Sequence, residues 1–199
     1  MAFIRTIAEE EAPADVQQMY DRNLQSMGYI PNYSRVFSHR PKVMETWGNM
    51  LGSIRENMDP RCYELVTMAA ARALKSSYCM LAHGSILRKQ FYTPEQLAAI
   101  ATDYQTADLT AAEVAMMAFA EQIARDATII TQEHIDGLRE HGFSDAEIFD
   151  IAAAATARCF FSKTLDALGA EPDEVYLELE DDLRQTLTVG RPIAGQSAE

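Results

Sequence analysis

The sequence has little of three things that would assign it to a class: cysteine, positive charge and long apolar runs. Its three cysteines, Cys62, Cys79 and Cys159, are an odd number at wide spacing, so they do not suggest a disulfide framework, and we expect a reducing cytoplasm. Lys and Arg number 17 against 30 Asp and Glu, which gives a net charge of −13. This charge repels a phosphate backbone and argues against a nucleic-acid partner.

No segment is long and apolar enough to span a bilayer. The most apolar one, residues 148–161, is too short and contains Asp150 and Arg158. The N-terminal residues turn acidic by residue 9 and lack the apolar segment and the cleavage site of a secretory signal. We therefore expect a cytoplasmic location and no membrane partner.

Apolar residues recur with a helical period almost throughout, and no run alternates strictly as a strand would. Asp59 followed by Pro60 predicts a helix start, and Thr110 with Glu113 has the spacing of a capping box. These signals and the periodicity predict helices at about 13–26, 43–57, 59–74, 77–91, 92–104, 110–126, 132–141 and 144–169, with a weaker signal at 173–187. The sequence predicts one all-α domain, 1–199, without a long linker.

Residues 73–89 (ALKSSYCMLAHGSILRK) place reactive residue types at helical spacing. With a helix that begins near Ser77, Cys79 falls in the first turn, where free N–H groups and the helix dipole favour a thiolate. His83 lies one turn later on the same face and can accept the thiol proton. Spacing alone leaves the alternative of a packed cysteine open, and Ser76 stands where a CxxC pair would have its first cysteine.

Glu64 adds a carboxylate to this arrangement. Only two or three residues separate helix 59–74 from helix 77–91, so the two must form a hairpin. The register puts Glu64 about 7.5 Å beyond the level of His83, so a bridging water or a tilted crossing is expected between them. Glu64, Cys79 and His83 also suit Zn²⁺, but the sequence offers no fourth ligand, so we predict no metal and no cofactor.

Glu64, Ser76, Cys79 and His83 have the spacing E-x11-S-x2-C-x3-H. This pattern resembles the alkylhydroperoxidase D-like branch of the carboxymuconolactone decarboxylase superfamily, in particular its peroxidase-related proteins. The segments DPRCYELVTMAAARAL, QEHIDGLREHGFSDAEIFDI and DALGAEPD are similar to further parts of the family in the same order. The resemblance covers about residues 30–175, and the N-terminal helix and C-terminal tail outside it are expected to serve packing or oligomer contacts.

The resemblance implies an all-α helical bundle, a homo-oligomer and a peroxidase that reduces alkyl hydroperoxides with a thiol. It makes Cys79 the nucleophile, which becomes a sulfenic acid when it reacts with a small-molecule peroxide. His83 and Glu64 serve as a proton relay. In redox-active members a first cysteine closes a disulfide, and a lipoyl adaptor protein or another thiol reductant reopens it. Ser76 holds that position here, and it can donate a hydrogen bond to the sulfur but cannot form the disulfide.

The missing cysteine keeps two other functions open. Glu64 and His83 would also serve the acid–base chemistry of a decarboxylase-like member that acts on a lactone acid and needs no CxxC pair. The third hypothesis is a non-catalytic oligomeric scaffold or binding protein that has lost the CxxC pair. Residues 189–199 lack helical periodicity, and we expect a neighbouring subunit to hold them in place.

Overall fold

The computed structural model describes residues 2–196, and these residues form α-helices and short 3₁₀ turns without a strand, which confirms the predicted all-α class. The helices are α1 (Ala14–Met27), α2 (Asn32–Phe37), α3 (Pro41–Arg55), α4 (Pro60–Ala73), α5 (Ser77–Gln90), α6 (Pro94–Asp103), α7 (Ala111–Asp126), α8 (Gln132–Glu140), α9 (Asp145–Ala167) and α10 (Asp181–Leu187). The weak signal at 173–187 corresponds to a 3₁₀ turn, Glu174–Glu178, followed by α10.

The predicted helix starts are confirmed by their caps. Asp59 accepts a hydrogen bond from the backbone N–H of Cys62 at the start of α4, at 3.0 Å. Thr110 and Glu113 form a complete capping box at the start of α7. These bonds satisfy backbone donors that have no partner inside the helix, which is why the local sequence marks the helix starts so well.

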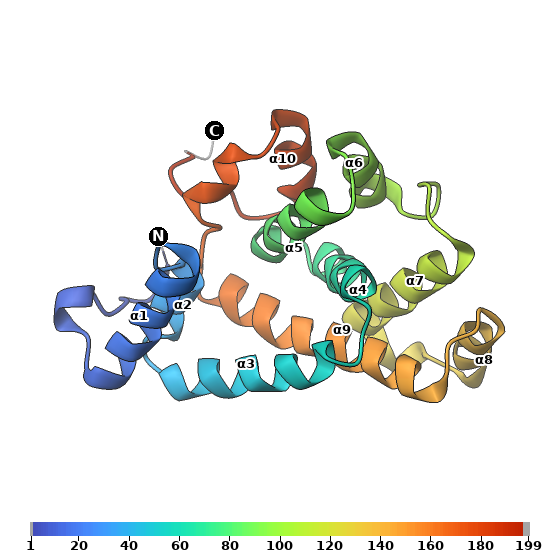
Figure 1. Ribbon diagram of the computed structural model, residues 1–199, viewed down its shortest axis with the longest axis horizontal. Coiled ribbons are helices and arrows are strands. Elements are labelled where there is room, and N and C mark those ends of the chain that lie inside the picture. Colours follow the sequence, from blue (N-terminus) through green and yellow to red (C-terminus); the bar gives the residue numbers. More distant parts are fainter. Residues whose placement is uncertain (1, 197–199) are drawn as a thin grey trace.

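Helix α4 lies at the centre of the molecule and packs against α5, α7 and α9 (Figure 1). Every residue from Tyr63 to Ala71 is buried, which is the pattern of a helix that is covered on all sides. The longest helix, α9, also packs against α7, and α3 runs alongside it. Within residues 2–196, no helix combines the length and the apolar character that a membrane crossing requires.

The turn between α4 and α5 is as short as predicted. Lys75 adopts a left-handed backbone conformation with φ of 54°, and the N–H of Ser76 donates to the carbonyl of Ala71 at 3.0 Å. This single left-handed residue reverses the chain, so α4 and α5 pack side by side as a hairpin.

The described part of the C-terminal tail packs on its own chain rather than projecting from it. The side chain of Ile193 is fully buried, and the N–H of Gly190 donates to the hydroxyl of Ser77 at 2.7 Å. A Cβ at position 190 would lie 2.2 Å from the carbonyl oxygen of Lys75, so only glycine fits there. Residues 189–196 are thus held by contacts within the chain, and residues 197–199 lie outside the described part.

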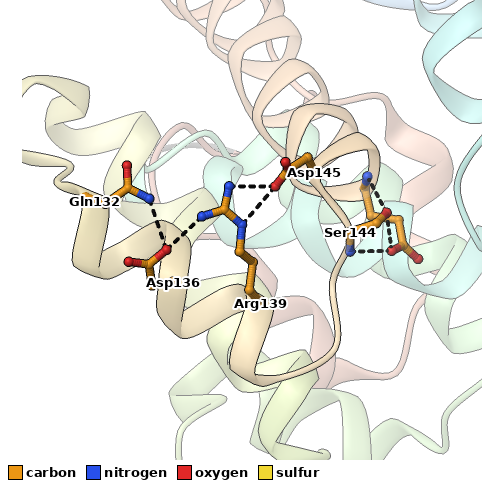
Figure 2. A network of polar contacts seen from close by, with 6 residues as sticks. Gln132, Asp136, Arg139, Ser144 and Asp145 are labelled. Carbon is orange, nitrogen blue, oxygen red and sulfur yellow. Dashed lines mark hydrogen bonds and ion pairs between the residues drawn. The ribbon is translucent and has the colours of Figure 1, made fainter.

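The junction of α8 and α9 is organised by exposed polar contacts (Figure 2). Arg139 donates to Asp145 at 2.9 Å and to Asp136 at 2.7 Å, which ties the end of α8 to the start of α9. Ser144 and Glu147 form the capping box that begins α9. Exposed ion pairs contribute little to stability individually, so the capping box is the stronger determinant of where α9 starts.

Candidate active site

Cys79 lies in the first turn of α5, as predicted, and its side chain is only 1 % exposed. Two side chains of α9 donate to its sulfur: the hydroxyl of Ser162 at 3.0 Å and Nη1 of Arg158 at 3.4 Å. The donors are four residues apart and so lie on one face of their helix. A guanidinium and a hydroxyl at a buried sulfur stabilise negative charge on it, as a thiolate nucleophile requires.

Glu64 and His83 are in direct contact across the α4–α5 hairpin. Oε2 of Glu64 lies 2.5 Å from Nδ1 of His83, so of the two expected ways to close the gap the bridging water is not needed. A carboxylate only accepts hydrogen bonds, so Nδ1 carries the proton and Nε2 is the basic nitrogen of the neutral ring.

His83 is held mainly in its neutral form. Burial lowers the pKa of its imidazole, the positive charge of Arg158 lowers it further, and the hydrogen bond from the ring to Glu64 opposes both. A neutral imidazole with a fixed tautomer is suited to accept a proton near neutral pH. Within residues 2–196 the ring makes no hydrogen bond to the sulfur, although Cys79 and His83 are one helical turn apart.

The thiol of Cys79 and the Glu64–His83 pair face one cavity of about 230 Å³. Cys79, Glu64, His83 and Arg158 all line it, together with exposed Arg55. The remaining walls are apolar or aromatic side chains from six helices and one 3₁₀ turn: Met27, Tyr33, Met44, Trp47, Leu51, Tyr63, Tyr78, Ala82, Ile86, Phe161 and Tyr176. The sulfur, the proton acceptor and the cation are thus presented together to a small molecule that enters the cavity.

Ser76 has a different place from the one predicted for its hydroxyl. It is the fully buried N-cap residue of α5, but its side chain makes no capping bond and no hydrogen bond to the sulfur. Ser162 supplies the hydroxyl that bonds the sulfur instead. The donor therefore comes from a helix more than 80 residues away, which no local spacing could indicate.

The other two thiols stand apart from this cavity. Burial, followed by the negative charge of Asp59, raises the pKa of Cys62 to about 11, and Cys62 lines a separate cavity beside α7 and α9. Burial also raises the pKa of Cys159. Both thiols are therefore protonated at neutral pH and are poor nucleophiles.

Arg158 and Ser162 are the site residues that the sequence motif did not include. The available signal was Arg158 itself, a charged residue within the most apolar segment of the chain, because a buried arginine needs a partner or a function. No group of three His, Cys, Asp or Glu side chains within residues 2–196 is arranged to hold a metal ion.

Comparison with known proteins places this site in a family context. The sequence model of the carboxymuconolactone decarboxylase family matches residues 41–122, a segment that contains Glu64, Ser76, Cys79 and His83 and ends before Arg158. No curated protein matches the sequence significantly.

Three solved structures share the fold. The alkylhydroperoxidase AhpD core of an uncharacterized peroxidase-related protein from Ralstonia eutropha JMP134 has a TM-score of 0.77 and 23% identity, over 96% of this chain and 98% of that one. An uncharacterized peroxidase-related protein from Silicibacter sp. TM1040 has a TM-score of 0.76 and 21% identity, over 87% and 95%. The debrominase Bmp8, in a cysteine-to-alanine variant complexed with 2,3,4-tribromopyrrole, has a TM-score of 0.70 and 20% identity, over 92% and 95%.

The fold is therefore that of the all-helical AhpD-like proteins. The family match, residues 41–122, spans the α4–α5 hairpin, so this part of the chain is similar to the carboxymuconolactone decarboxylase family.

Proposed function

We propose that this protein is a thiol-dependent peroxidase that reduces small organic hydroperoxides, with Cys79 as the nucleophile. The observation that carries the proposal is the sulfur of Cys79, which accepts hydrogen bonds from Ser162 and Arg158 and lines the same cavity as the Glu64–His83 pair. A nucleophile beside a cation, with an oriented imidazole in the same cavity, is the arrangement that activated cysteines use.

In the proposed reaction, His83 accepts the thiol proton at Nε2 and leaves Cys79 as a thiolate beside Arg158. The sulfur attacks the terminal oxygen of the hydroperoxide, the O–O bond breaks, and Cys79 becomes a sulfenic acid. The leaving alkoxide takes the proton from the imidazolium and departs as an alcohol. Glu64 stabilises the transient imidazolium through the hydrogen bond at Nδ1.

Regeneration then requires an external thiol, because Ser76 cannot form a disulfide and neither Cys62 nor Cys159 lines the cavity. The first thiol releases water and forms a mixed disulfide with Cys79, and a second thiol frees the cysteine as the external disulfide leaves. A small thiol or the dihydrolipoyl group of an adaptor protein would serve.

We predict that Ser76→Cys creates a pair able to form a disulfide and raises turnover with dithiols. Thiols at both positions that stay reduced under mild oxidant would contradict this.

The test is consumption of cumene hydroperoxide with and without dithiothreitol, combined with dimedone labelling and mass spectrometry. We expect consumption that depends on the dithiol and a dimedone adduct at Cys79. Cys79→Ser should abolish both, whereas the matched variant Cys62→Ser should retain them. No consumption by the wild-type protein, with Cys79 unlabelled, would refute the proposal.

The Glu64–His83 contact favours a second candidate, an acid–base enzyme of the decarboxylase kind that acts on a lactone acid. The pair is complete without the sulfur, since the carboxylate bonds the imidazole directly. Proton exchange or decarboxylation that survives Cys79→Ser but not His83→Gln would favour this function over the peroxidase. A chain that is inactive in both assays would leave a non-catalytic scaffold.

We further propose that the protein forms a homo-oligomer. Apolar side chains are exposed on neighbouring faces of α3 and α9, among them Val43, Met50, Phe149 and Phe160. A surface hollow of about 430 Å³ lies between the two helices and is lined almost entirely by apolar atoms. Large exposed apolar areas of this kind mark contact surfaces. Light scattering should give a mass above the 22.2 kDa of one chain, and a monomer at micromolar concentration would refute the assembly.

A further inference from the structure

The charge of the active-site cavity is opposite to that of the whole chain. The chain carries a net charge of −13, yet two guanidinium groups, those of Arg55 and Arg158, line this cavity. Its single carboxylate, Glu64, is engaged by His83. Within residues 2–196, neither arginine forms an ion pair with an acidic side chain. The cavity is therefore a local positive region in an acidic protein.

Arg158 is the more informative of the two, because it is only 3 % exposed. Its Nη1 donates to the sulfur of Cys79, while its buried Nε has no hydrogen-bond partner in the described part of the chain. The guanidinium carbon lies 5.4 Å from the ring centre of Phe161 and 5.8 Å from that of Trp47, contacts that offset part of the cost of burying the charge. An unpaired donor on a buried cation is costly and normally has a partner, and a bound anion would provide one.

The walls of the cavity define the rest of the ligand. Aromatic rings dominate them, with Trp47 stacked on Phe161 at 4.1 Å between ring centres and Tyr33 edge-on to the same Phe161. Flat rings favour offset or edge-on contacts with other rings. Pockets for drug-sized ligands measure roughly 300–1,000 Å³, so the 230 Å³ of this cavity suits a smaller molecule with one ring.

We propose that the cavity binds a small single-ring aromatic anion of the benzoate type. The carboxylate binds Arg158 beside the sulfur, and the ring lies among Trp47, Phe161 and the tyrosines. Arg55, exposed at the cavity, attracts the anion toward it. This inference rests on the proposed function only in taking the cavity as the substrate site.

The experiment uses the single tryptophan of the chain as its probe, since Trp47 lines the cavity. Benzoate is titrated into the wild-type protein against benzamide, a neutral molecule of the same shape, while the tryptophan fluorescence is recorded. Charge-assisted bonds to Arg are about twice as strong as neutral ones, and we expect benzoate to bind at least ~10-fold more tightly than benzamide. Equal binding of the two compounds, or no binding of benzoate, would overturn the inference.

Protection of the sulfur gives a second readout at the same site. Benzoate should slow the alkylation of Cys79 by iodoacetamide, whereas benzamide should not. Arg158→Gln should abolish the preference for benzoate, and Arg158→Lys should retain part of it. Arg125→Gln, which changes an exposed arginine of α7 outside the cavity, is the matched control and should bind as the wild type does. If Arg158→Gln binds benzoate normally, the inference is wrong; if it does not fold, the wild-type comparison of the two ligands decides.

The outcomes also separate this inference from the proposed function. Benzoate binding without hydroperoxide consumption would keep the anion site and remove the peroxidase. Hydroperoxide consumption that benzoate neither inhibits nor competes with would keep the peroxidase and remove the anion site.

Discussion

Replacing Glu64 with glutamine tests whether the Glu64–His83 pair acts on the thiol. The substitution keeps the shape of the side chain, and an amide oxygen can still accept from Nδ1 of His83, but the charge is lost. Hydrogen bonds to charged groups contribute about 1.5–3 kcal/mol, and each 1.4 kcal/mol is a factor of ten. The carboxylate is almost fully buried, so screening by solvent does not reduce this figure much. We expect the alkylation of Cys79 near neutral pH to slow by roughly 10- to 150-fold.

The same variant should also change the pH dependence of the alkylation rate. Burial and Arg158 lower the pKa of His83, while Glu64 raises it. Without the carboxylate the pKa falls further, so the imidazole stays neutral to a lower pH. The acid limb of the rate profile should therefore move to lower pH while the plateau falls. A variant that is only misfolded would not produce this pair of changes together.

The assay is the rate of iodoacetamide labelling, followed by mass spectrometry of the peptide that contains Cys79, from pH 5 to 9. Glu180→Gln is the matched control, because Glu180 lies outside the cavity and pairs with Arg88 at the surface. It should label as the wild type does. We also expect His83→Ala to slow labelling more than Glu64→Ala, since only the imidazole can take the thiol proton. An unchanged plateau in Glu64→Gln, or an acid limb that moves to higher pH, would refute the reasoning.

Three further outcomes are expected. At neutral pH iodoacetamide should label Cys79 well before Cys62, because burial raises the pKa of Cys62 to about 11; equal labelling by peptide mass spectrometry would contradict this. Burial lowers the pKa of His83 in the folded protein below the unfolded value of about 6.5. The unfolded chain therefore binds the proton more readily, and the folded state loses stability as pH falls below about 6.5. Urea unfolding between pH 7 and 5 should show that loss, and His83→Gln should diminish it. Gly190→Ala should cost at least ~1–3 kcal/mol of unfolding free energy, because its Cβ would meet the carbonyl oxygen of Lys75; unchanged melting would show that the tail packs differently.

The sequence by itself determined the helical class, the main helix boundaries and the members of the central motif. Caps such as Asp59 and Thr110 bond backbone groups within three residues, so their effect can be predicted from the local sequence alone. The position of Cys79 in a first turn and of His83 one turn later follows from helical geometry alone. Even the hairpin was determined locally, by the two or three residues between α4 and α5.

Only the tertiary structure decided which groups surround the sulfur. Side chains that meet across helices depend on tilt, rotation and reach, and these are set by packing over the whole core rather than by spacing. For that reason Glu64 touches His83 without a water, Ser162 rather than Ser76 donates to Cys79, and the buried charge of Arg158 faces the cavity. The chemistry of the site thus depends on α9, whose contribution lies beyond any motif within the hairpin.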